Sequence, residues 1–142
     1  MTHTPITPDL PIAEAARLMT ADELTTVIGH LPALQASADT LAVHETRKAI
    51  RRTLTLFKLF APTFAPDALT PHRQGLRLLM RRLSPCRDLA VFRQKLAAYN
   101  ESAATPLTAL AARLDARQAR ADKRLRRYLQ RQNGPRSRWK WS

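Results

Sequence analysis

The sequence has little of several residue types on which common protein classes depend. A single cysteine, Cys86, occurs in 142 residues, so an intramolecular disulfide is excluded and a zinc site would need other ligands. Three glycines are too few for turn-rich β architectures or for glycine-lined nucleotide folds. No stretch approaches the roughly 18 apolar residues of a membrane span, and the start has neither the basic nor the apolar part of a signal peptide. We therefore expect a cytoplasmic protein that does not bind membranes.

Acidic residues are also scarce, with 11 Asp and Glu against 24 Lys and Arg and a net charge of +13. The imbalance lies in one part of the chain. Residues 1–43 carry one basic and five acidic side chains, a net charge of −4, whereas residues 44–142 carry 23 basic and six acidic ones, a net charge of +17. Such a density of one charge repels itself unless a polyanion, a membrane surface or an acidic partner lies nearby.

The chain is long enough for one compact domain, and 44% apolar residues suffice for a core. We expect a flexible, proline-containing arm over residues 1–11, a helical domain over residues 12–132 and a basic tail over residues 133–142. Apolar residues recur at helical spacing, and no segment with strand spacing competes. The prediction is an all-α fold, most simply an antiparallel four-helix bundle.

Prolines and capping residues predict where the helices begin and end. Gly29 and Pro32 indicate a stop after the first helix, and Ser84–Pro85 indicates a kink within the third. The predicted helices cover about residues 11–28, 40–60, 70–84, 86–100 after the kink, and 105–132.

Each predicted helix has an apolar line that should face the core. The lines of the first, third and last helices include Ile12, Ala16, Val27, Ile28, Leu76, Leu79, Leu83, Leu107, Leu110, Leu114 and Leu125.

The second helix carries a basic stripe beside its apolar stripe. With about 100° of rotation per residue, its apolar stripe consists of Val43, Ile50, Leu54 and Phe57. A band about 40° to 140° away contains His44, Arg47, Lys48, Arg51, Thr55 and Lys58. A solvated face is the ordinary interpretation of such a band. However, Glu45 is the only acid after Asp39 on this helix, so salt bridges at i, i+4 are missing and the cations, Arg52 included, repel one another.

The third and last helices repeat this arrangement. The third helix has Arg73, Arg77 and Arg81 at i, i+4 and i+8. The last helix has a row along one flank of its apolar line that consists of Arg113, Arg117, Arg120, Arg124, Arg127 and Arg131. Each row alone is compatible with a solvated face, but three such helices could line one groove. Arginine suits a phosphate-binding groove because its planar fork binds oxygens in pairs and keeps its charge.

Two segments resemble a known family. Val43–Lys58, which opens V-H-E-T-R-K-A-I-R-R, resembles the first motif of the CHAD domain, the conserved histidine α-helical domain. Leu76–Val91, L-R-L-L-M-R-R-L-S-P-C-R-D-L-A-V, is similar to the leucine–arginine helix of that family and its Arg-Asp dipeptide. The last helix resembles, more weakly, the helix that ends the first half of the family's domain. The resemblance covers about residues 12–131 and corresponds to one half of a CHAD-like architecture.

The resemblance implies a helical protein that binds inorganic polyphosphate in a basic groove or pore and associates with polyphosphate granules. By position, the implied ligands are His44, Arg47, Arg51, Arg52, Lys58, Arg77, Arg81 and Arg87. To these we add Lys48, Arg117, Arg120 and Arg124 from the same basic stripes. Leu54 and Ala90 depart from the family's pattern, which usually has a basic residue and an acid at these positions.

Other functions remain open at this point. A nucleic-acid-binding protein would use the same stripes and could stack bases on Trp139 and Trp141, and an interaction domain would dock an acidic protein. No carboxylate pair, glycine-rich loop or activated nucleophile indicates an enzyme, and His44 has no second ligand at i+3 or i+4 for a metal. We expect neither catalysis nor a cofactor nor a bound metal. A homodimer is expected because a two-fold pair would restore two halves.

Overall fold

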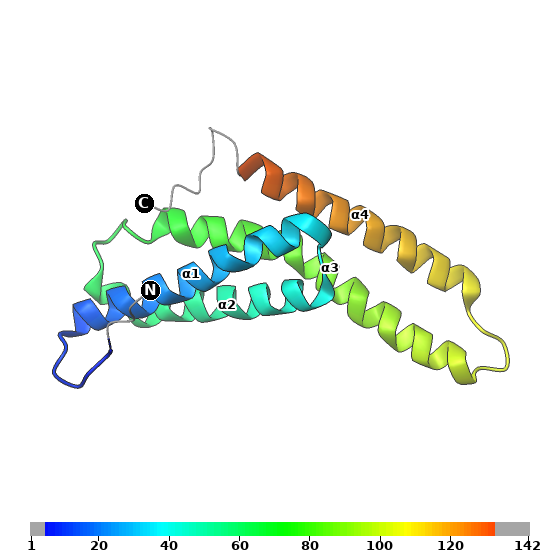
Figure 1. The fold of residues 1–142 in the computed structure, drawn as a ribbon, viewed down its shortest axis with the longest axis horizontal. Coiled ribbons are helices and arrows are strands. Elements are labelled where there is room, and N and C mark those ends of the chain that lie inside the picture. The colour runs from blue at the N-terminus through cyan, green and yellow to red at the C-terminus, as the bar shows by residue number, and fades with distance from the viewer. Residues whose placement is uncertain (1–4, 133–142) are drawn as a thin grey trace.

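The computed structural model describes residues 5–132, which contain four long helices (Figure 1). The helices are α1 (Ile12–Ser37), α2 (Thr40–Leu59), α3 (Thr70–Ser102) and α4 (Thr108–Gln132). A short 3-10 turn, η1 (Ala61–Thr63), follows α2. Within the described residues there is no strand, and the predicted all-α class is confirmed.

The helices pack as two antiparallel hairpins, α1 with α2 and α3 with α4. Helix α2 also packs on α3, and α1 packs less extensively on α4, so the four helices close into a bundle. Beyond the turn that joins α1 to α2, the α3–α4 hairpin projects away from the other two helices (Figure 1). The predicted bundle is confirmed, but its last two helices extend well past its first two.

Helix α1 does not end where the sequence predicts. It continues through Gly29 and Pro32 to Ser37. Pro32 lacks an N–H, so one carbonyl a turn earlier loses its helical donor. The helix continues because Val27 and Leu34, on either side of this defect, are buried in the core. Packing of the apolar face therefore outweighs the missing hydrogen bond.

Helix α3 is likewise one helix and not two that are separated at Pro85. Its ribbon changes direction near the middle, as expected where a proline removes a helical hydrogen bond (Figure 1). The Ser84 hydroxyl donates to the Met80 carbonyl over 2.9 Å, and Leu83 and Cys86 on either side of the proline are buried. The predicted kink is thus a bend inside a continuous helix.

The other predicted boundaries agree with the structure to within a few residues. The Asp39 side chain accepts a hydrogen bond from the N–H of Ala42 over 3.4 Å and caps α2, as its residue type predicts. Helix α2 ends at Leu59, and α4 begins at Thr108.

The core confirms most of the predicted apolar lines. Its largest fully buried side chains are Leu34, Ile50, Phe57, Leu76, Leu79, Leu83 and Leu125. Full burial of a side chain of this size contributes about 1.5–3 kcal/mol.

The prediction of core burial is wrong for four residues, because Ile12, Ile28, Leu107 and Leu110 are exposed. Ile12 is the first residue of α1, where the helix has little to pack against. Leu107 and Leu110 lie where the α3–α4 hairpin has left α1 and α2 behind, so no further helix of the described chain covers them.

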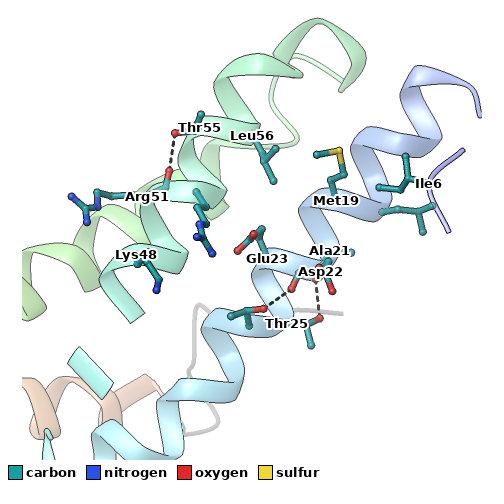
Figure 2. A pocket seen from close by; sticks show the side chains of 13 residues that line it. Ile6, Met19, Ala21, Asp22, Glu23, Thr25, Lys48, Arg51, Thr55 and Leu56 are labelled. Carbon is teal, nitrogen blue, oxygen red and sulfur yellow. Dashed lines mark hydrogen bonds between the residues drawn. The ribbon is translucent and has the colours of Figure 1, made fainter. Parts of the chain in front are cut away.

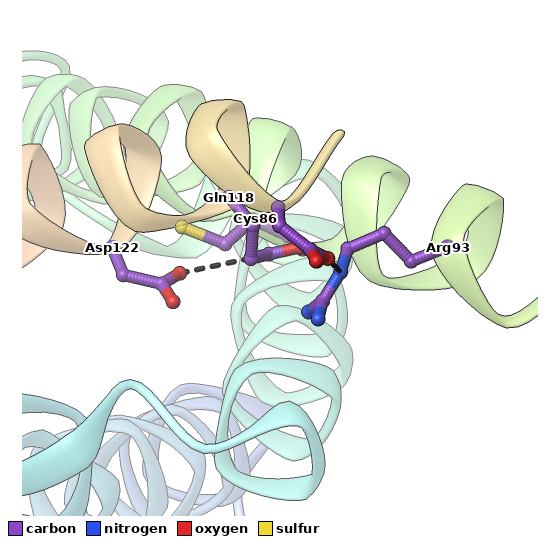
Figure 3. Close-up of polar contacts among 5 residues, drawn as sticks. Cys86, Arg93, Gln118 and Asp122 are labelled. Atoms are coloured by element: carbon purple, nitrogen blue, oxygen red, sulfur yellow. Dashed lines mark hydrogen bonds and ion pairs between the residues drawn. The ribbon is translucent and has the colours of Figure 1, made fainter. Parts of the chain in front are cut away.

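Polar contacts fix α4 against α3 where the hairpin leaves the bundle (Figure 3). Nε2 of buried Gln118 donates to the Cys86 carbonyl over 3.3 Å and to the Asp122 carboxylate over 2.9 Å. Further along, Nε of Arg93 donates to Oδ1 of Asp115 over 2.7 Å. Because these bonds need particular partners, they set the register of α4 along α3.

Replacing Phe57 by Ala should lower the free energy of unfolding by about 3–5 kcal/mol, since the side chain is fully buried. The same change at Leu59, two residues later and exposed, should alter it by about 0.5 kcal/mol or less. Urea unfolding followed by circular dichroism measures both. Equal losses in the two variants would contradict the packing of α2 described above.

Burial raises the pKa of the Cys86 thiol to about 12, and the nearby Asp122 carboxylate adds to the effect. Thiols of unfolded chains titrate at about 8.5. Because the folded pKa is the higher one, this group's contribution to stability is complete below about pH 8.5 and is lost as the pH rises towards 12. At pH 8 we expect a thiol reagent to label the folded protein no faster than it unfolds. Rapid labelling with unchanged helicity would contradict this burial.

Candidate functional site

A small basic groove lies between the end of α2 and the beginning of α3. Its volume is about 420 Å³. It is lined by Leu54, Thr55, Lys58, Ala61, Arg73 and Arg77. The lining thus has three cations and no acid. Lys58 and Arg77 were predicted as ligands, and the structure brings them together with Arg73.

The sequence explains why these cations meet. Helices α2 and α3 pack against each other and run in opposite directions, so the last turn of α2 lies beside the first turns of α3. Lys58 follows buried Phe57, and Arg77 follows buried Leu76, so each cation lies at the margin of the core. Arg73 is one turn before Arg77 and therefore on the same side of α3. Its i, i+4 spacing was visible in the sequence, although Arg73 was left out of the predicted ligand set.

A larger groove, of about 1100 Å³, lies between α1 and α2 (Figure 2). It contains three predicted ligands, Lys48, Arg51 and Arg52. Asp22 and Glu23 of α1 line the same groove, and Figure 2 shows Glu23 directed towards α2. The negative charges of these two carboxylates lower the positive potential of the groove. It is therefore less suited to a polyanion than the groove between α2 and α3.

Lys48 is also paired within its own helix. Its Nζ donates to Glu45 over 3.0 Å, and the closest N–O distance of this ion pair is 2.8 Å. The hydrogen bond from Lys48 holds the pKa of the Glu45 carboxyl below its ordinary value. The sequence analysis considered i, i+4 pairs on this helix, and Glu45 and Lys48 form an ion pair at i, i+3 spacing instead.

Arg47 lies on the α2 stripe and lines neither groove. It is half-buried, and its Nε is buried with no hydrogen-bond partner among the residues that the structure describes. A buried donor without an acceptor costs about 1–3 kcal/mol. An anionic oxygen that reaches Nε would recover that free energy. Arg47 is thus the predicted ligand with the clearest unmet need for an acceptor.

His44 and Arg87 lie at the other end of the α2–α3 contact, and both are half-buried. The two helices are antiparallel, and Arg87 is as far from Arg73 along α3 as His44 is from Lys58 along α2. Arg87 is therefore level with His44. His44 belongs to the first motif of the sequence and Arg87 to the second, and the two residues lie at the same end of the α2–α3 contact.

The remaining predicted ligands are exposed and line neither groove. Arg81 follows Arg77 by one turn on the same side of α3. Arg117, Arg120 and Arg124 project from α4. Each of the two grooves joins two helices, so the structure distributes the predicted ligands over several places.

Residues 5–132 hold no helix long and apolar enough to cross a membrane. Nor does this part of the chain gather three or more His, Cys, Asp or Glu residues that could hold a metal ion.

A helical bundle with arginine-rich sides and an acid-free groove belongs to the class of proteins suited to bind polyanions. The chain belongs to the CHAD domain family, whose sequence model matches residues 19–137. CHAD domains are known to bind polyphosphate. Neither a search of curated proteins nor a search of solved structures found a match to this chain.

Replacing Glu45 by Gln should raise the affinity for tripolyphosphate about two- to threefold, because it removes a negative charge from the basic stripe and frees Lys48. Stability should change little, since the pair is partly exposed. Glu101→Gln, at the far end of α3, removes the same charge and should leave the affinity nearly unchanged. Titration calorimetry at physiological salt compares them. An equal gain in both variants would contradict a local effect.

Proposed function

We propose that this protein binds inorganic polyphosphate on the basic sides of α2 and α3 and does not catalyse a reaction. The observation that carries the proposal is the groove in which Lys58, Arg73 and Arg77 meet without an acid. Polyphosphate is anionic along its whole length, so a site can recognise it by charge and by the fork geometry of arginine. Three cations held in one groove offer contacts to successive phosphates.

A polymer longer than the groove needs further cations along which it can bind. From Lys58 the α2 stripe continues through Arg51 and Arg47 to His44, with Arg87 of α3 at the same level. The unpartnered Nε of Arg47 lies on this path and supports it. Each phosphate that the protein neutralises releases counterions, so binding should weaken steeply as salt is added.

Nucleic acid is the second candidate, because its phosphates would find the same cations. The groove between α2 and α3 has no aromatic side chain in its lining, so it offers no platform on which a base could stack. This observation favours polyphosphate. Trp139 and Trp141, the residues proposed for stacking, lie outside the described residues.

The proposed binding of polyphosphate needs no catalytic step. The groove has no carboxylate and no cysteine, and the Thr55 hydroxyl donates to the Arg51 carbonyl over 2.9 Å. A protein that holds the polymer without cleaving it would accumulate where polyphosphate does, in cytoplasmic granules. Fluorescence microscopy of the tagged protein, in cells with and without polyphosphate, would test this accumulation.

The double variant Lys58→Glu, Arg77→Glu should bind long-chain polyphosphate at least about tenfold more weakly, because two charge-assisted contacts become repulsive. The control is Lys123→Glu, Arg126→Glu on α4, which makes the same change in net charge at exposed positions away from the groove. A fluorescence titration at physiological salt measures both, with circular dichroism to verify helicity.

Two results would count against the proposal. Equal losses in the two double variants would mean that net charge, and not the groove, determines binding. Displacement of polyphosphate by DNA or RNA of equal total charge at equal concentration would favour the nucleic-acid function. We expect polyphosphate to be retained against both competitors.

A further inference from the structure

The larger groove, between α1 and α2, takes part in the proposed binding of polyphosphate only through Arg51, which lies on the α2 path. Its volume of about 1100 Å³ is large enough for a small organic molecule. Its lining combines aliphatic side chains with two carboxylates and three cations, whereas the groove between α2 and α3 has no acid. A ligand that fits this lining needs an apolar part as well as a charged part.

The aliphatic and the cationic side chains lie at opposite ends of this groove. Helices α1 and α2 are antiparallel, so Met19 lies at the level of Leu56, further than Arg51 from the turn that joins the two helices. The aliphatic end consists of Ile6, Leu18, Met19 and Leu56, and the cationic end consists of Lys48, Arg51 and Arg52. Figure 2 shows the labelled members of these two sets on either side of Glu23. The groove is therefore polar at one end and apolar at the other.

Glu23 is directed across the groove but does not neutralise the cations by contact. Within residues 5–132, no ion pair joins Glu23 to Arg51 or Arg52. Both arginines are exposed, and Glu23 is half-buried. The arginines can therefore donate to the oxygens of an anionic group, and Glu23 can accept a hydrogen bond from a hydroxyl. Because the same carboxylate repels further negative charge, a head with a single phosphate fits this groove better than a polyanion.

The apolar end of the groove suits a hydrocarbon chain and not a planar ring. Its four side chains are aliphatic, so they offer no aromatic platform on which a nucleotide base could stack. Leu56 follows Arg52 by one turn on the same side of α2, about 6 Å along the helix. A phosphate bound to Arg52 thus has aliphatic side chains beside it, and each methylene that they cover strengthens binding.

We propose that the groove between α1 and α2 binds a single-chain phosphate amphiphile. Its chain lies on the aliphatic end, its phosphate accepts hydrogen bonds from Arg51 and Arg52, and a hydroxyl between the two donates to Glu23. The order of the lining selects this class of ligand, because apolar, acidic and cationic side chains follow one another along the groove. This site goes beyond the proposed function, and Arg51 is the only charged residue that it shares with the polyphosphate path.

Titration calorimetry with four compounds, each below its critical micelle concentration, tests which parts of the ligand are recognised. The probe is octanoyl glycerol phosphate. Glycerol phosphate lacks its chain, octanoyl glycerol lacks its phosphate, and ADP has hydroxyls and phosphates but no aliphatic chain. We expect the probe to bind at least about tenfold more tightly than each of the others, since burial of about two methylenes gives this factor.

Three results of that titration would overturn the inference. Equal affinity for glycerol phosphate would mean that the aliphatic end takes no part. ADP that binds as tightly as the probe would identify a nucleotide site. Binding of the probe only above its critical micelle concentration, or only in vesicles, would mean that the protein recognises a charged lipid surface and not a single molecule.

A variant of the aliphatic end locates the chain. Ile6→Gln, Met19→Gln should weaken binding of the probe at least about fivefold and leave the affinities for glycerol phosphate and tripolyphosphate unchanged. The control is Ile12→Gln, Ile28→Gln, because both residues are exposed apolar side chains of α1 outside the groove. Equal probe affinity in the two double variants would overturn the inference. Ile6→Gln alone, which lies before α1, provides the same comparison without a change inside a helix.

A variant of the cationic end locates the phosphate. Arg52→Gln should weaken binding of both the probe and glycerol phosphate at least about fivefold, whereas Arg126→Gln on α4 removes the same charge and should affect neither. Equal effects of the two changes would overturn the assignment of the head group. Loss of tripolyphosphate binding in the unchanged protein would count against the proposed function and not against this site, so the two proposals are tested separately.

Discussion

Repulsion between like charges is the constraint on which the rest of this structure depends. Residues 44–142 carry a net charge of +17, and the helices must pack closely enough to bury a core. The protein places its cations at the margins of the buried stripes, where they stay hydrated while Phe57, Leu76 and their neighbours pack. Within residues 44–132, Lys48 pairs with Glu45 and Arg93 pairs with Asp115. The remaining positive potential is the feature that supports the proposed binding of a polyanion.

The architecture divides this charge unequally. The acids of α1 lie against one side of α2, whereas α3 faces the other side of α2 with arginines and no acid in the groove. The predicted ligands of α2 form one stripe on a helical wheel, but in the structure they lie in two different electrostatic environments. Lys48, Arg51 and Arg52 have carboxylates across a groove, and Lys58 has further cations. CHAD domains bind polyphosphate, and under the proposed function this division identifies the part of the surface with the strongest attraction for a polyanion.

Periodicity and capping predicted the four helices, and the Asp39 cap and the buried stripe of α2 are examples. They failed at Pro32, because tertiary packing compensates there for a lost hydrogen bond that local signals treat as a stop. At Pro85 they predicted the change of direction, and the structure adds that the helix is continuous through it. They also placed Leu110 in the core. The spacing of apolar residues shows which side of a helix is apolar, but it does not show whether another helix covers that side. The candidate cations were visible in the sequence, but the meeting of Lys58 with Arg73 depends on how α2 packs against α3.

The connection between α1 and α2 consists of Ala38 and Asp39 alone, and Ala38 adopts a left-handed backbone conformation with φ of 46°. This link keeps the end of α1 beside the start of α2, and packing between the two helices holds the rest of α1 against α2. The carboxylates of α1 therefore act as tethered counterions whose local concentration does not fall when the protein is diluted. Across the width of α2 the electrostatic potential then rises from the α1 side to the α3 side. Under the proposed function, an approaching polyanion would be steered along this gradient before it makes any contact.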